Sequence, residues 1–398
     1  MLRVLAVALS LVVYHGIGGI AGVSQADEAN VPGPPLLPPD PESAPSPSDT
    51  VTEGPALPPP PIASPAGDQL PTPPEPPPPP IAPAPPPPPP KAPPRPEPTT
   101  PVLDEDYAYQ GEYVGKTNTP GLGCQAAGLQ VVARGDGKFQ ARQFRGGLPG
   151  AGFNRRDTFE LHGELGEGRL LLSAGDPQRY RIEISGGVAE LRNSADQLIG
   201  LLTQTRRVSP TLGRRPPANA TVLFDGTGLE AFAQARWIDG DLLLPEVMTR
   251  APVKDFILHL EFRTPYLPTK SSQGRGNSGV YIQERYEVQI LDSFGLLAGS
   301  GDCGAVYRYR APDVNMAFPP MQWQTYDILF RSPVFDASGK KVKNARITVK
   351  HNGVNVQSWV ELTRKTGNGR PEGPDARPLR LQWHGNPVAF RNVWMVEL

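Results

Sequence analysis

Apolar and polar residues alternate between Asn277 and Ser293, which predicts two neighbouring β-strands with a short polar break at Glu284 and Arg285. Alternation with period two places apolar side chains on one face and polar side chains on the other. The apolar face carries Val280, Ile282, Tyr286, Val288 and Ile290. The opposite face carries Asn277, Gly279, Tyr281, Gln283, Glu287, Gln289 and Leu291. Amide, phenol and carboxylate groups suit a polar cleft better than a solvated surface.

Similar short alternating runs, separated by Gly/Pro turns, continue to the C-terminus and predict an all-β domain over residues 209–398. Besides Val222–Gly226, the expected strands are Leu242–Leu244, Phe256–Arg263, Gly279–Gln283, Tyr286–Leu291, Ala305–Tyr309, Trp323–Phe330, Ala345–His351, Val354–Gln357, Leu379–Trp383 and Val388–Val396. With no long helical pattern, they favour a β-sandwich of jelly-roll type. A closed barrel is the alternative.

Residues 102–208 predict a smaller all-β domain. An Asp-Gly turn at Asp136 and Gly137 separates two apolar runs, Leu129–Ala133 and Lys138–Phe144, which is a strong hairpin signal. Further short strands are expected at Thr158–Leu161, Arg169–Leu172, Tyr180–Ile184, Val188–Arg192 and Gln197–Thr203. No catalytic constellation stands out in this domain.

Composition changes sharply before these two domains. Residues 1–26 have the order of a secretory signal peptide: a basic start at Arg3, a short apolar run, and small residues Ser24 and Ala26 at a cleavage site. An uncleaved anchor is the alternative. Residues 27–101 hold most of the 52 prolines and predict a disordered, proline-rich linker. We therefore expect a secreted, periplasmic or cell-surface protein, which the N-terminus could tether to a membrane or cell wall.

The charge balance gives no reason to expect a nucleic-acid partner, because the formal net charge is −1. The two cysteines, Cys124 and Cys303, show no metal-ligand spacing. They could pair with each other or remain free thiols.

The polar faces of several predicted strands carry groups suited to acid–base chemistry. If these strands adjoin in one sheet, carboxylates, an imidazole, an arginine and amides converge in one groove, a set that can transfer protons on a sugar-like ligand. The candidates are Glu261, Arg263, Glu287, Gln289, Asp327, Gln382 and His384, with His259 beside Glu261. Structural alternatives stay open: a strand glutamate beside an arginine often forms a salt bridge, and His384 could stabilise a turn.

The C-terminal domain also resembles a known family in a series of segments that occur in the same order. They are L-F-D-G (223–226), F-I-L-H-L-E-F-R (256–263), R-G-N-S-G-V-Y-I-Q (275–283), R-Y-E-V-Q-I-L-D-S (285–293), C-G-A-V-Y (303–307), W-Q-T-Y-D-I (323–328), H-N-G-V (351–354) and L-Q-W-H-G-N-P-V-A-F-R-N-V-W (381–394). Together they resemble the 3-keto-disaccharide hydrolase domain family. Trp383 departs from the pattern, because many relatives have a smaller or acidic residue before the histidine.

The resemblance implies a concanavalin A-like jelly roll, bacterial export and activity on 3-keto-glycosides. A ketone at C3 acidifies the C2 hydrogen, so a base can remove it; the aglycone then leaves C1, and water adds back. On this reading Glu261, Glu287 and His384 transfer protons and Arg263 stabilises charge. Asn277, Tyr281, Gln289, Asp327 and Gln382 would bind the sugar. A divalent metal ion held by carboxylate and imidazole could serve the enolate instead.

Three other interpretations remain open at this stage. An oxocarbenium route with paired carboxylates is one, although the Glu-x-Asp-x-x-Glu strand motif of jelly-roll glucanases is absent. A non-catalytic carbohydrate-binding module that uses the same groove is the second. The third is a cell-surface adhesion protein that keeps only the fold. Tyr281, Trp323 or Trp383 could stack on a sugar ring.

Overall fold

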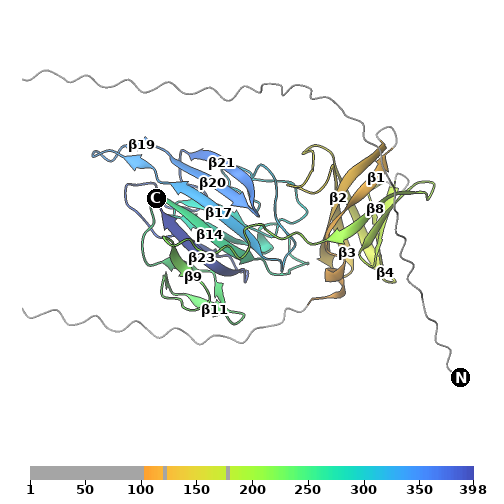
Figure 1. The fold of residues 1–398 in the computed structure, drawn as a ribbon, viewed down its shortest axis with the longest axis horizontal. Coiled ribbons are helices and arrows are strands. Elements are labelled where there is room, and N and C mark those ends of the chain that lie inside the picture. Colours follow the sequence, from red (N-terminus) through yellow and green to blue (C-terminus); the bar gives the residue numbers. More distant parts are fainter. Residues whose placement is uncertain (1–102, 120–122, 176–179) are drawn as a thin grey trace, which may run out of the picture. The chain divides into compact units, whose positions relative to one another are not determined.

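A computed structural model of the protein describes residues 103–119, 123–175 and 180–398 (Figure 1). The predicted signal peptide and proline-rich linker lie outside the described residues. Within the described part the chain is all-β, as predicted, and its helices are two short 3-10 turns, Glu105–Ala108 (η1) and Ser272–Gly274 (η2). None of the helices in this part is long and apolar enough to cross a membrane.

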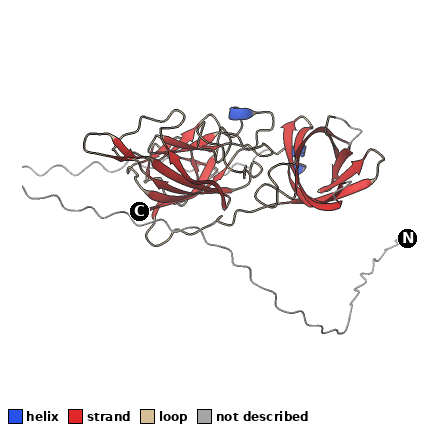
Figure 2. Cartoon of the chain, turned by 90° about the horizontal axis from the view of Figure 1, so that it is seen from above, coloured by secondary structure: helices blue, strands red, loops and turns tan. Residues whose placement is uncertain are grey.

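The first eight strands form a closed barrel, in which each strand pairs antiparallel with the next and β8 returns to β1. Figure 2 shows them as a ring. The strands are β1 (Gly111–Thr119), β2 (Gly123–Gly135), β3 (Lys138–Arg145), β4 (Thr158–Gly166), β5 (Arg169–Ser173), β6 (Tyr180–Ser185), β7 (Val188–Asn193) and β8 (Leu198–Thr205). Alternate apolar side chains, such as Leu129 and Val131 on β2, fill the interior. Closure removes the free strand edges.

The Asp-Gly turn predicted between β2 and β3 is confirmed. Gly135 pairs with Lys138, so that Asp136 and Gly137 form the loop. Both have positive φ, 56° and 72°, which is the geometry of the type I′ turn that matches the twist of a hairpin.

The C-terminal strands form two sheets that pack face to face as a sandwich (Figure 1). The five-stranded sheet runs in the order β10 (Phe232–Ala233), β13 (Val247–Thr249), β22 (Arg380–Trp383), β15 (Ser278–Ile282), β16 (Tyr286–Ile290). The eight-stranded sheet runs β11 (Arg236–Ile238), β12 (Leu242–Leu244), β23 (Ala389–Glu397), β14 (Phe256–Arg263), β17 (Gln324–Arg331), β20 (Ala345–His351), β21 (Val354–Leu362), with β9 (Thr221–Phe224) beside β23. A separate hairpin joins β18 (Val334–Phe335) and β19 (Lys341–Lys343).

The apolar faces of both sheets meet in one core. Val280 of β15 and Val288 of β16 are fully buried there, as are Leu258 and Leu260 of β14. Because side chains alternate along a strand, the polar residues between them point outward, away from the opposite sheet. The outer face of the five-stranded sheet and the outer face of the eight-stranded sheet are therefore separate surfaces.

One predicted strand is wrong. Residues 305–309 form turns with isolated bridges at Val306. Positive φ values at Gly304 (83°) and Arg308 (52°) interrupt the extended backbone on both sides of Val306. The segment still covers the edge of β16, where the Tyr307 N–H donates to the Glu287 carbonyl (3.0 Å).

The two cysteines do not pair. Cys124 is exposed and Cys303 is buried in the sandwich core, and both are free thiols.

Candidate active site

Glu287 is the central residue of the polar face on the five-stranded sheet. Its side chain is 3% exposed, and its Oε2 accepts a hydrogen bond from the Tyr281 hydroxyl (2.7 Å) on the neighbouring strand β15. The register pairs Tyr281 directly with Glu287, which explains why these two polar side chains meet. The structure therefore brings two of the predicted site residues together.

Gly279 makes room for the carboxyl group. A Cβ atom at this position would lie 2.6 Å from Glu287 Oε1 and 3.2 Å from Gln382 Oε1. Both oxygens thus point to the same space above Gly279. Gln382 Oε1 is buried without a hydrogen-bond partner among the described residues.

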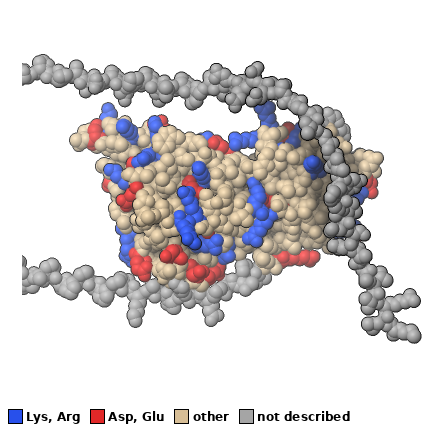
Figure 3. Space-filling model, viewed as in Figure 1, with Lys and Arg blue, Asp and Glu red and all other residues tan. Residues whose placement is uncertain are grey.

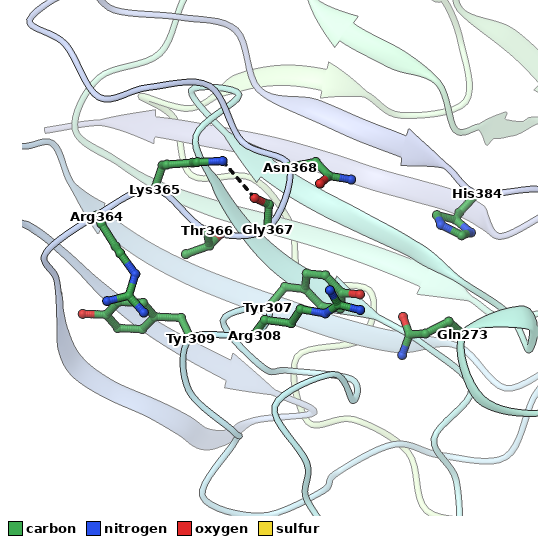
Figure 4. A pocket seen from close by; sticks show the side chains of 10 residues that line it. All are labelled: Gln273, Tyr307, Arg308, Tyr309, Arg364, Lys365, Thr366, Gly367, Asn368 and His384. Atoms are coloured by element: carbon green, nitrogen blue, oxygen red, sulfur yellow. Dashed lines mark hydrogen bonds between the residues drawn. The ribbon is translucent and has the colours of Figure 1, made fainter.

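A pocket of about 610 Å³ lies beside this carboxyl group (Figure 4). Its lining residues come from loops that surround the sheet: Gln273, Tyr307, Arg308, Tyr309, Arg364, Lys365, Thr366, Gly367, Asn368 and His384. A Cβ atom at Gly367 would lie 2.9 Å from Glu287 Oε2 and 2.9 Å from a ring carbon of Tyr307. Glu287 and the pocket wall are therefore adjacent.

The loop that forms one wall is fastened to the β15–β16 hairpin. Thr366 donates its N–H to the Arg285 carbonyl (2.9 Å), and its hydroxyl accepts from the Glu287 N–H (2.7 Å). The buried Arg285 guanidinium donates to the carbonyls of Pro371 (3.0 Å) and Asp375 (2.8 Å) further along the same loop. Through these hydrogen bonds the loop is fixed along the edge of the β15–β16 hairpin, and the pocket wall is held beside Glu287.

Burial raises the pKa of Glu287 to about 7, because water is excluded and the charged form loses hydration. The hydrogen bond from Tyr281 and the charges of Arg380 and Arg308 oppose this shift without cancelling it. A carboxyl group with this pKa can both take up and release a proton near neutrality, as a general acid or base must.

The other predicted residues of this sheet lie around Glu287. Asn277 donates to the Gln273 carbonyl (2.8 Å), and Gln289 donates to Gln273 Oε1 (2.9 Å). With its amide turned over, Gln289 instead donates to Glu287 Oε1 (3.2 Å). His384 follows β22 and lies exposed at the pocket rim, on the same side as Gln273 (Figure 4).

The structure does not bring Glu261, Arg263 or Asp327 to this pocket. Glu261 and Arg263 on β14 and Asp327 on β17 belong to the eight-stranded sheet and lie on its outer face. The expectation that their strands share one hollow with Glu287 is corrected here. Alternation identifies which face of a strand is polar, but it does not identify the sheet to which the strand belongs.

Glu261 forms a structural cluster. It is buried under residues 209–214 and accepts hydrogen bonds from the Gly213 N–H (2.6 Å), Arg391 (2.7 Å) and Asn392 (2.9 Å). Burial disfavours its charge, but hydrogen bonds from His259, Asn392, Gly213 and Arg391 outweigh burial and lower its pKa to about 2. A carboxylate with this pKa is a poor base at neutral pH, so Glu261 is suited to anchoring this segment.

The remaining two residues on that sheet are also paired. Asp327 forms a hydrogen bond with His259 Nδ1 (2.8 Å), and Arg263 donates to Asp239 (2.8 Å).

The two tryptophans expected to stack on a sugar differ in their surroundings. The guanidinium of Arg391 lies 4.0 Å from the ring centroid of Trp323 and occupies one face of that ring. Trp383, which is 37% exposed at the end of β22, remains available to stack on a sugar.

A metal ion held by Glu and His side chains was one expectation. Among residues 103–119, 123–175 and 180–398, no group of three or more His, Cys, Asp or Glu side chains is arranged to hold one.

Sequence reasoning missed most of the pocket wall. Gln273, in the loop before β15, lines the pocket. Tyr307, Arg308 and residues 364–368 were not expected, because loops have no periodicity that reports their position in space. The only signal was the basic and aromatic run Tyr307-Arg308-Tyr309-Arg310.

The C-terminal domain is a β-sandwich with a polar pocket beside a buried carboxyl group. The model of the 3-keto-alpha-glucoside-1,2-lyase-like domain matches residues 219–396. The chain belongs to this family, the 3-keto-disaccharide hydrolase domain family.

Two solved structures of candidate glycosyl hydrolases, both from Parabacteroides distasonis ATCC 8503, are similar to the chain. The first is 33% identical over 46% of this chain and 85% of its own, with a TM-score of 0.42. The second is 18% identical over 45% of this chain and 94% of its own, with a TM-score of 0.33. No curated protein matches the chain. By its membership of the family, the protein is glycosyl hydrolase-like.

The space above Gly279 provides a test of the site. We expect Gly279→Ala to displace the Glu287 and Gln382 side chains, because its methyl group would lie 2.6 Å from Glu287 Oε1. Glycoside cleavage should fall at least about 10-fold, since small displacements of catalytic groups are costly. Gly166→Ala is the matched control, because a Cβ atom there meets nothing within 4 Å. Equal activity of both variants would contradict this geometry.

The two buried glutamates should respond oppositely to amide substitution. Because burial raises the pKa of Glu287, its ionisation destabilises the folded state. This destabilisation is absent below pH 4.5, the ordinary pKa of a glutamate, and complete above pH 7. We expect Glu287→Gln to stabilise the fold at pH 8 by up to about 3 kcal/mol and to change nothing near pH 4. Glu261→Gln should destabilise it at pH 8 by about 1–3 kcal/mol, through lost charge-assisted bonds.

For Glu261 the folded pKa is lowered, so its stabilisation is complete above pH 4.5 and is lost as pH falls toward 2. Tryptophan fluorescence during denaturation measures both effects, because all five tryptophans lie in the sandwich, at positions 237, 323, 359, 383 and 394. A Glu287→Gln variant that is less stable than the parent at pH 8 would contradict the assignment.

Proposed function

We propose that the protein is an exported enzyme that cleaves 3-keto-glycosides by removal of the C2 proton, elimination of the aglycone and addition of water. Two observations support this proposal: membership of the family, and the buried Glu287 carboxyl group with a pKa of about 7 beside a pocket of sugar-like dimensions. The second observation carries the mechanism, because C2 deprotonation needs a base that is partly ionised at neutral pH.

In the first step Glu287 takes the C2 proton, and the C2–H electron pair forms a C2–C3 double bond while the C3 carbonyl becomes the negatively charged oxygen of an enolate. Those electrons then form the C1–C2 double bond as the C1–O bond breaks, and His384 protonates the departing oxygen. Water then adds across this double bond: His384 takes one of its protons as hydroxide bonds to C1, and Glu287 returns its proton to C2, which completes hydrolysis and restores both groups. Arg308, whose charge already acts on Glu287, is the candidate to stabilise the enolate oxygen.

The sugar hydroxyls have partners in the amides around Glu287. Gln382 offers an unpartnered acceptor, while Gln273, Gln289 and Asn277 form a hydrogen-bonded group at the same side of the pocket. Polar groups placed in this way orient a sugar over the carboxyl group. Trp383 at the sheet end could add stacking.

The direct test is turnover of a 3-keto-glucoside by the purified protein, beside the same glucoside with an intact C3 hydroxyl. We expect only the keto substrate to be cleaved, with a slower rate when C2 carries deuterium. Glu287→Gln should lower kcat/KM by about 10²–10⁴-fold, the usual contribution of a general base. The parent's kcat/KM should rise with pH through about 7, because the base acts when ionised.

Glu261→Gln is the matched control for chemistry, since Glu261 lies on the other sheet. It should keep turnover within a few-fold at a temperature where the variant is folded. Cleavage of the unoxidised glucoside at an equal rate, or unchanged turnover in Glu287→Gln, would exclude this mechanism. Binding of the keto-glycoside without turnover would favour a carbohydrate-binding module.

A further inference from the structure

The pocket wall is basic, although the chain as a whole is not. Its lining includes Arg308, Arg364 and Lys365 and no acidic residue, whereas the chain has a net charge of −1. Over the face of the molecule shown in Figure 3, acidic and basic side chains lie interspersed. The concentration of positive charge at the pocket is therefore local.

Aromatic rings, rather than carboxylates, hold two of these cations. The Arg308 guanidinium lies 5.2 Å from the Tyr307 ring centroid, and that of Arg364 lies 5.1 Å from the Tyr309 centroid (Figure 4). Arg364 forms no ion pair within the described part of the chain, whereas the charge of Arg308 acts on Glu287. A cation–π contact positions a guanidinium without neutralising its charge, so its N–H groups remain free to bind an anion.

Two nearby arginines, in contrast, form ion pairs with carboxylates. Arg310, two residues from Arg308, pairs with Asp313 (2.5 Å), and Arg380 on β22 pairs with Glu246 (2.7 Å). Lys365 donates one hydrogen bond, to the Gly367 carbonyl (3.1 Å), and an ammonium group has three donors. Arg364 and Lys365 thus line the pocket with no carboxylate ion pair in the described part of the chain.

The cations and the amide group occupy different ends of the pocket. Figure 4 shows Arg364 with Tyr309 at one end and Gln273 with His384 at the other, while Arg308 and Tyr307 lie between them. A sugar bound by the amides would therefore extend its substituent toward Arg364 and Lys365. An oxyanion on that substituent would accept charge-assisted hydrogen bonds there.

We propose that the pocket selects an anionic glycoside, whose carboxylate or sulfate group binds Arg364 and Lys365. This inference rests on the proposed function for the placement of the sugar ring, but binding can be measured without turnover. The proposal defines the substrate class by its negative charge. Removal of the C2 proton does not itself require a charged substrate.

The test is calorimetric titration of the full chain with disaccharides of one linkage: a neutral one, one with a uronic acid and one with a sulfate ester. We expect at least one anionic ligand to bind about 10-fold more tightly than the neutral one at low salt. Its Kd should rise with salt, because partly exposed charges are screened. The anionic disaccharide that binds more tightly shows whether the pocket prefers a carboxylate or a sulfate group.

The double variant Arg364→Gln/Lys365→Gln should abolish that preference and leave the neutral ligand's Kd unchanged within about threefold. The matched control is Arg346→Gln/Lys350→Gln, which removes two exposed cations from β20 on the other sheet and should leave the preference intact. Equal binding of neutral and anionic ligands by the parent, or a preference that survives the Arg364→Gln/Lys365→Gln substitution, would overturn the inference.

The outcome is separable from the proposed function. A protein that prefers the anionic ligands but cleaves no 3-keto-glycoside would refute the reaction and support the charge selection. A protein that cleaves a neutral keto-glycoside as well as an anionic one would support the reaction and overturn the charge selection.

Discussion

The buried carboxyl group of Glu287 is the constraint on which the account of this site depends. Its negative charge has no ion-pair partner within hydrogen-bonding distance among the described residues, and the Tyr281 hydroxyl supplies its main hydrogen bond. Such a carboxyl group destabilises the ionised folded state. The fold maintains it because the loop at Thr366 bonds to the backbone of β16, and because Gly279 leaves space for the carboxylate.

A comparison of Glu287 with Glu261 shows how environment assigns different roles to the same residue type. Both are almost fully buried on the outer faces of strands. Glu261 receives hydrogen bonds from Arg391, Asn392 and the Gly213 N–H, which fix its charge and tie a connecting segment to the sheet. Glu287 has far fewer such donors, and its proton is therefore exchangeable near neutrality.

The sequence was sufficient for the all-β fold, most strands and the polar face on β15 and β16, because alternation with period two is a local property. It could not assign Glu261 and Glu287 to different sheets, because strand order depends on long-range pairing. It also missed Arg308 and Arg364, because loop residues have no periodicity. The absence of a strand at 305–309 followed from positive φ at Gly304 and Arg308, which an apolar alternation does not reveal.

The most direct measurement of the central claim is the protonation of Glu287 itself. In protein labelled with ¹³C at the glutamate carboxyl carbon, NMR titration should contain one resonance that changes with a pKa of about 7 and is missing from Glu287→Gln. If that resonance instead titrates at the ordinary glutamate value of 4.5, the carboxyl group is not held as an acid–base catalyst and the account of the site is contradicted.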